Sequence, residues 1–84
     1  MHSITDLATL RDALRDFCAA RDWHRFHTPK NLVMALSVEA AELVEHFQWA
    51  TPEESMNLAP GKRAEVADEI ADVLIYLTEL ADVL

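Results

Sequence analysis

Two pairs of acidic residues, each pair spaced three apart, are the residues of this chain best suited to do chemistry. The first pair is Glu39 and Glu42, and the second is Glu69 and Asp72. Residues three apart share one face of a helix, so each pair would project two carboxylates in the same direction. Two such pairs facing each other could bind hard divalent cations through oxygen ligands. The spacing therefore indicates a metal site.

The segments around the two pairs correspond in register. Residues 39–47 align without gaps on residues 69–77, which gives His46 and Tyr76 equivalent positions. A single acidic pair is usually a solvated helix face. Two matched pairs beside an apolar stripe are harder to explain in this way, because neighbouring carboxylates disfavour joint ionisation unless a cation compensates their charge.

Composition predicts one small all-α domain. The chain has 84 residues, of which 51% are hydrophobic, and it contains one Gly and three Pro. Such a composition favours helices over strands. A chain of this length buries little more than half of its unfolded surface, so we expect self-association to add to the core.

The charge and the cysteine content exclude several classes of function. A net charge of −8 provides no basic stripe for a nucleic acid polymer. No apolar run reaches the length of a membrane span and no signal peptide is recognisable, so we expect a cytoplasmic protein without a membrane contact. Cys18 is the only cysteine, which excludes an intramolecular disulfide, and its place on an apolar face predicts core packing rather than nucleophilic catalysis.

Helix signals place the acidic pairs inside two long helices. Ser3 or Thr5 could cap a first helix that ends near Arg21 or Asp22. Thr28 and Pro29 are a cap and a first-turn proline, which predicts a second helix that continues to about Trp49. A similar signal at residues 51–54 predicts a short third helix, the Pro60–Gly61 pair predicts a turn, and a last helix follows from Lys62.

The apolar stripes on the three longer helices predict how they assemble. Two long helices and a first helix of similar character would form half of a four-helix core, which a second copy of the chain would complete. We therefore expect a homodimer, or a homotetramer built as a dimer of dimers. The acidic pairs would meet near the subunit interface.

Three segments together resemble the MazG-like nucleoside triphosphate pyrophosphohydrolases, and in particular the dCTP pyrophosphatase type. They are RDWxxFHxPKNL at residues 21–32, ALxxExxELxExFQW at residues 35–49 and ExxDVLIYL at residues 69–77. The resemblance implies a MazG-like helical bundle and one MazG-like domain over residues 1–84. Relatives usually continue with a further C-terminal segment, which we do not find after Leu84.

The resemblance also implies an activity and its cofactor. A (deoxy)nucleoside triphosphate would be hydrolysed to the monophosphate and pyrophosphate in a Mg²⁺-dependent reaction that removes unwanted nucleotides from the pool. The metal ligands would be Glu39, Glu42, Glu69 and Asp72. Either Glu42 or Glu45 could orient or deprotonate the attacking water, and the spacing does not distinguish between them.

Further residues match positions that relatives use to hold the nucleotide. Aromatic faces can stack on any base, and the start of a helix presents free N–H groups to phosphate. Ordinary packing of the tryptophans, a capping role for the histidine and a solvated lysine are the alternatives. The matching residues are Trp23, His27, Trp49 and Tyr76 around the base and sugar, and Lys30 and Asn31 near the phosphates.

Other functions fit the same residues less well. A ferritin-like di-metal protein takes Glu-x-x-His on two helices, whereas the residue three after Glu39 or Glu69 is acidic. A glycosidase pair would need a sugar-sized cleft. A non-catalytic helical dimerisation or nucleotide-binding module, which has lost activity, would keep the apolar stripes without needing the acidic pairs. The apolar Leu14, where cytosine-selective relatives can place a polar group, leaves the base preference open.

Overall fold

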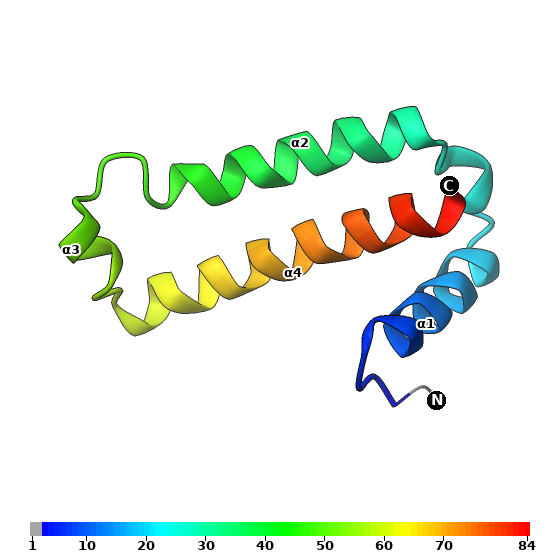
Figure 1. Ribbon diagram of the computed structural model, residues 1–84, viewed down its shortest axis with the longest axis horizontal. Helices are drawn as coiled ribbons and strands as arrows, with labels where there is room; N and C mark the ends of the chain where they lie inside the picture. The colour runs from blue at the N-terminus through cyan, green and yellow to red at the C-terminus, as the bar shows by residue number, and fades with distance from the viewer. Residues whose placement is uncertain (1–2) are drawn as a thin grey trace.

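A computed structural model describes residues 3–84, and these residues form helices without any strand. The all-α class predicted from the sequence is therefore confirmed. Figure 1 shows α2 and α4 side by side in opposite directions, with α3 at one end of this hairpin and α1 at the other. The elements in chain order are α1 (Leu7–Ala20), the short 3₁₀-helix η1 (His24–Phe26), α2 (Pro29–Glu45), α3 (Pro52–Ser55) and α4 (Pro60–Val83).

The first helix begins later than either predicted cap would allow. Asp6 is the N-cap, and its carboxylate accepts a hydrogen bond from the Thr9 N–H at 2.8 Å. The Thr9 hydroxyl oxygen in turn accepts from the Asp6 N–H at 3.1 Å. This reciprocal pair satisfies free N–H groups of the first turn, which neither Ser3 nor Thr5 does. The prediction of a cap at Ser3 or Thr5 was wrong.

The later helix starts follow the sequence signals more closely. Thr28 caps α2 by accepting from the Asn31 N–H at 3.2 Å, and Thr51 and Glu54 form the predicted capping box of α3. Two boundaries differ from the prediction. The second helix ends at Glu45, before Trp49, and Pro60 belongs to the first turn of α4 and not to a turn before it, since a proline is well suited to a first helical position.

The buried core of the single chain is small. Among the described residues only Cys18, Leu32 and Val66 are buried hydrophobic side chains. Large apolar side chains on α2 and α4, such as Val44 and Ile70, remain more than half exposed. Apolar surface of this extent is unusual on a monomer. The prediction that a second copy completes the core is compatible with this surface, and it stays a prediction.

An ion pair holds the first helix against the C-terminal end of α4, and a sharp turn follows the helix. Arg15 on α1 forms a two-pronged ion pair with Asp82, in which its Nε donates at 2.8 Å. Asp22 has a φ of 54°, a left-handed conformation that aspartate tolerates better than most residues, and it turns the chain from α1 into η1. Within residues 3–84, no helix has the length and apolar character needed to cross a bilayer.

Candidate functional site

The packing of α2 against α4 brings the two acidic pairs together. Glu39, Glu69 and Asp72 each offer a carboxylate oxygen, and these three atoms lie within 4.8 Å of one another. Glu42 belongs to the same group, because its charge acts on both Glu39 and Glu69. We call these four residues the carboxylate cluster. Three of the four predicted metal ligands thus meet, and Glu42 lies close enough for its charge to act on two of them.

Mutual repulsion and burial change the acidity of this cluster. Partial burial, followed by the charge of Glu42, raises the pKa of Glu39 to about 7. The nearby Glu69 carboxylate also favours the protonated form of Glu39. Burial and the charge of Glu42 likewise raise the pKa of Glu69. The cluster therefore holds a proton near neutral pH when no cation compensates its charge.

Two oxygen atoms of the cluster lack any partner. Glu39 Oε2 and Glu69 Oε2 are buried, and neither has a hydrogen-bond donor within reach. Burial of a polar atom without a partner is unfavourable and uncommon in folded proteins. A divalent cation between the helices would supply the missing partner for both oxygens. Because the four residues offer only oxygen ligands, the arrangement suits a hard cation such as Mg²⁺.

His46 lies at the edge of the same region. Its Nδ1 atom is buried without a hydrogen-bond partner, and the nearest acidic oxygen, Glu65 Oε2, is 4.0 Å away. The sequence alignment already placed His46 at the position equivalent to Tyr76. A third buried polar atom without a partner therefore lies at the C-terminal end of α2.

A cavity of about 430 Å³ lies between α1 and α4. We call it the end cavity. Its wall includes the aromatic rings of Phe17, Trp23 and Tyr76, together with His27 and Glu79. Phe17 and Trp23 pack edge to face with 5.5 Å between their ring centroids. The volume is in the range of small-molecule sites in proteins.

Tyr76 connects the end cavity to the carboxylate cluster. Burial raises the pKa of its phenol, and the charges of Glu39, Glu79 and Asp72 raise it further. Tyr76 therefore stays protonated and can donate a hydrogen bond. Three of the residues predicted to hold a nucleotide, Trp23, His27 and Tyr76, line this one cavity.

Cys18 and Glu79 form the polar part of the cavity wall. The Cys18 side chain is 3% exposed, as expected for a core residue, and its Sγ lies 3.4 Å from Glu79 Oε1. Burial and the Glu79 carboxylate raise the pKa of this thiol to about 11, so it is not a thiolate nucleophile at neutral pH. Sequence reasoning missed Glu79. Its spacing of seven residues from Asp72, on the same face of α4, was the available signal.

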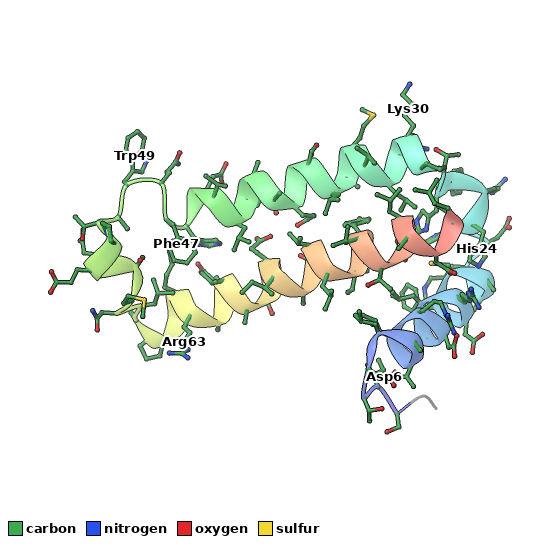
Figure 2. The ribbon with its side chains drawn as sticks, viewed as in Figure 1. Asp6, His24, Lys30, Phe47, Trp49 and Arg63 are labelled. Atoms are coloured by element: carbon green, nitrogen blue, oxygen red, sulfur yellow. The ribbon has the colours of Figure 1, made fainter. Side chains whose placement is uncertain are left out.

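Two predicted phosphate contacts lie at the start of α2. Lys30 is exposed and points away from the hairpin in Figure 2. The Asn31 side chain donates to the Phe26 carbonyl oxygen at 2.9 Å and so holds the turn between η1 and α2. A direct phosphate contact by Asn31 would require this hydrogen bond to break or to be shared.

The remaining predicted residues lie apart from the end cavity. Glu45 is the last residue of α2 and is exposed. Trp49 is 88% exposed on the loop before α3. Figure 2 places Trp49 and His24 at opposite ends of the molecule. The single chain thus brings Trp23, His27 and Tyr76 together, and it does not bring Trp49 to them.

The fold and the site together define a helical-hairpin protein with a carboxylate centre between two antiparallel helices. The sequence profile of the MazG-like family matches residues 34–84, which include all four residues of the carboxylate cluster. The chain belongs to the MazG-like family, as the sequence resemblance implied.

The known proteins to which this chain is similar carry the name pyrophosphatase. Over 78 residues it is 47% identical to dCTP pyrophosphatase 1 of Homo sapiens, a match that covers 87% of this chain and 46% of the human protein. Over 84 residues it is 45% identical to dCTP pyrophosphatase 1 of Bos taurus, with 94% and 50% covered. The chain thus spans about half the length of these curated relatives.

A solved structure shares the fold over almost the whole chain. It is the crystal structure of a pyrophosphatase from Archaeoglobus fulgidus, which superimposes with a TM-score of 0.85 at 45% sequence identity. The match covers 99% of this chain and 78% of the other. Both α1 and the α2–α4 hairpin therefore belong to the shared fold.

Proposed function

We propose that this protein hydrolyses (deoxy)nucleoside triphosphates to the monophosphate and pyrophosphate, and that the reaction depends on Mg²⁺. The observation that carries the proposal is the pair of buried, unpartnered oxygens of Glu39 and Glu69 beside an aromatic cavity. The names of the relatives, dCTP pyrophosphatase and pyrophosphatase, support the same reaction class. The expected role is to remove unwanted nucleotides from the cytoplasmic pool.

In this proposal the carboxylate cluster holds the metal. When bound, Mg²⁺ would neutralise negative charge on the triphosphate and activate water for attack. Such a cation is needed because the chain carries a net charge of −8 and would otherwise repel an anionic substrate. Glu42, within the cluster, and Glu45, three residues further along α2, remain the two candidates for orienting or deprotonating the attacking water.

The end cavity is the proposed site for the base and sugar. Trp23 offers an aromatic face for stacking, and His27 and Tyr76 offer polar atoms on the same wall. Tyr76 lies between this cavity and the carboxylate cluster, so a nucleotide could reach both at once. Lys30, at the start of α2, remains a candidate phosphate contact.

We also propose that the working unit is a homodimer or a homotetramer of one-domain chains. The exposed apolar side chains of α2 and α4 would be covered by the second copy. Trp49 is far from the end cavity of its own chain, so it would contact a nucleotide bound by another copy. Size-exclusion chromatography with light scattering measures the mass, and a monomer at assay concentration would contradict this part of the proposal.

Pyrophosphate release from a panel of normal and modified nucleoside triphosphates, including dCTP, tests the activity. Each substrate is assayed with and without Mg²⁺ for the wild type, for Glu39→Gln and for Glu53→Gln, a control on an exposed carboxylate outside the site. We expect release that requires Mg²⁺, survives Glu53→Gln and is lost in Glu39→Gln. A folded protein that releases no pyrophosphate from any substrate would favour the non-catalytic dimerisation or nucleotide-binding module.

A further inference from the structure

Three side chains of types that can bind metal meet near the C-terminal end of α4, outside the carboxylate cluster. Cys18 comes from α1, His27 follows η1, and Glu79 comes from α4. Cys18 Sγ lies 3.7 Å from His27 Nδ1 and 3.4 Å from Glu79 Oε1, and His27 Nδ1 lies 3.6 Å from Glu79 Oε2. We call these residues the Cys–His–Glu cluster. His27 is also a proposed nucleotide contact, whereas the proposed hydrolysis uses neither the Cys18 thiol nor the Glu79 carboxylate.

The separations fit a tetrahedral metal site. Zinc binds thiolate sulfur at about 2.3 Å and histidine nitrogen or carboxylate oxygen at about 2.0 to 2.2 Å, which places neighbouring ligands about 3.4 to 3.6 Å apart. The sulfur–nitrogen separation of 3.7 Å is close to these values. Glu79 contacts the sulfur through Oε1 at 3.4 Å and the nitrogen through Oε2 at 3.6 Å, so its carboxylate must rotate to bring one oxygen near both. The ligand atoms all lie within 4.8 Å of one another.

A small void beside the three residues supplies a second observation. Cys18, His27 and Glu79 all line a cavity of about 20 Å³, and the same three residues also belong to the wall of the larger end cavity. A space of this size holds about one water molecule. A zinc ion with three protein ligands keeps its fourth position for a water or another small ligand. The void is therefore of the size that this fourth ligand requires.

We propose that Cys18, His27 and Glu79 form a binding site for a borderline-soft divalent transition-metal ion of the Zn²⁺ class. Sulfur and imidazole ligands select such ions over Mg²⁺ and Ca²⁺, which prefer oxygen. Binding converts the Cys18 thiol to a thiolate, and the proton leaves to solvent. The site goes beyond the proposed function, and it differs from the carboxylate cluster in ligand chemistry and in position.

Cobalt spectroscopy on the 84-residue chain tests this site directly. Co²⁺ bound to a thiolate gives a sulfur-to-metal charge-transfer absorption band, which oxygen and nitrogen ligands do not give. Because Cys18 is the only cysteine, the band reports this cluster and ignores any cobalt in the carboxylate cluster. The titration uses metal-free protein and a reductant without thiols. We expect one cobalt ion per chain to give the band, and Zn²⁺ to displace it.

Variants with matched controls identify the ligands. Cys18→Ser should abolish the band, with Cys18→Ala as an alternative if the hydroxyl impairs folding. His27→Asn and Glu79→Gln should each weaken cobalt affinity at least about tenfold. The controls are His24→Asn, for a histidine that lines the same small cavity, and Glu65→Gln, for an exposed glutamate on α4; both should leave the affinity unchanged.

Two results would overturn the proposal. One is the absence of a charge-transfer band from a protein whose circular dichroism shows full helical content. The other is a band that persists in the His27→Asn/Glu79→Gln double variant, since this would show that cobalt binds Cys18 without the other two residues. In either case the three residues form a hydrogen-bonded group and not a metal site.

Discussion

The carboxylate cluster and the Cys–His–Glu cluster differ in how far each is satisfied by the protein alone. In the carboxylate cluster two buried oxygens have no partner, and the pKa values of Glu39 and Glu69 are raised. In the Cys–His–Glu cluster each group has a polar neighbour at 3.4 to 3.7 Å. The first arrangement is unfavourable without a cation, whereas the polar groups of the second have partners within the protein.

This difference shows where the chain keeps unfavourable interactions. Like charges on α2 and α4 repel each other in the middle of the hairpin that the core depends on. Such an arrangement costs stability unless a ligand compensates the charge, which is common at functional sites. The two clusters also suit different metal ions, because one offers only oxygen ligands and the other offers sulfur, nitrogen and oxygen ligands.

The largest expected effect is loss of activity when the carboxylate cluster is broken. Glu69→Gln should lower Mg²⁺-dependent pyrophosphate release at least about 100-fold, because a metal ion contributes several kcal/mol of charge stabilisation. The same variant should keep the cobalt charge-transfer band of Cys18. Steady-state kinetics and cobalt titration on one preparation measure both. Loss of the band together with the activity would show that the two clusters are not independent.

A smaller effect is expected from the aromatic wall of the end cavity. Trp23→Ala should raise KM about tenfold, since stacking on a base is worth about 1 to 3 kcal/mol, and should leave the Mg²⁺ concentration dependence unchanged. Phe26→Ala is the control, because Phe26 is an exposed aromatic residue of η1 that does not line the cavity. An equal rise of KM in both variants would contradict a base site at Trp23.

The raised pKa of Glu39 predicts how the stability of the metal-free protein depends on pH. Between pH 4.5, the ordinary pKa, and about 7, the folded value, native Glu39 binds more protons than unfolded Glu39. The free energy of unfolding should therefore fall as pH rises through this window, and Glu39→Gln should reduce the slope. Urea unfolding at several pH values provides the measurement. Parallel curves for the wild type and the variant would show that Glu39 is not strained in the folded state.

The smallest effect is expected where α1 meets α4 at the surface. Arg15→Gln removes the ion pair with Asp82. The Arg15 side chain is half exposed, and exposed ion pairs contribute little stability, so the thermal midpoint should fall only slightly. Cobalt affinity at Cys18 should decrease with it, because α1 carries this ligand, while Mg²⁺ dependence stays the same. Calorimetry and cobalt titration measure the two effects. A weaker Mg²⁺ response would mean that α1 also supports the carboxylate cluster.

Much of the fold was predictable because helix starts depend on a few neighbouring residues. Thr28 with Pro29, and Thr51 with Glu54, act within one turn, and both signals were interpreted correctly. The cap of α1 was misplaced because Asp6 competes with two hydroxyl residues just before it, and the reciprocal bond with Thr9 decides between them. The acidic pairs were also evident, since their spacing is a property of each helix alone.

The sequence by itself determined the helices, the family and the four carboxylates, because periodicity and capping act over a few residues. Only the tertiary structure decided which oxygens lack partners, that Trp49 and His24 lie at opposite ends of the molecule, and that Glu79 lies beside Cys18, 61 residues away in sequence. These features depend on how α1 and α2 pack on α4. The relative placement of these helices depends on the whole hairpin, and no local pattern of residues encodes it.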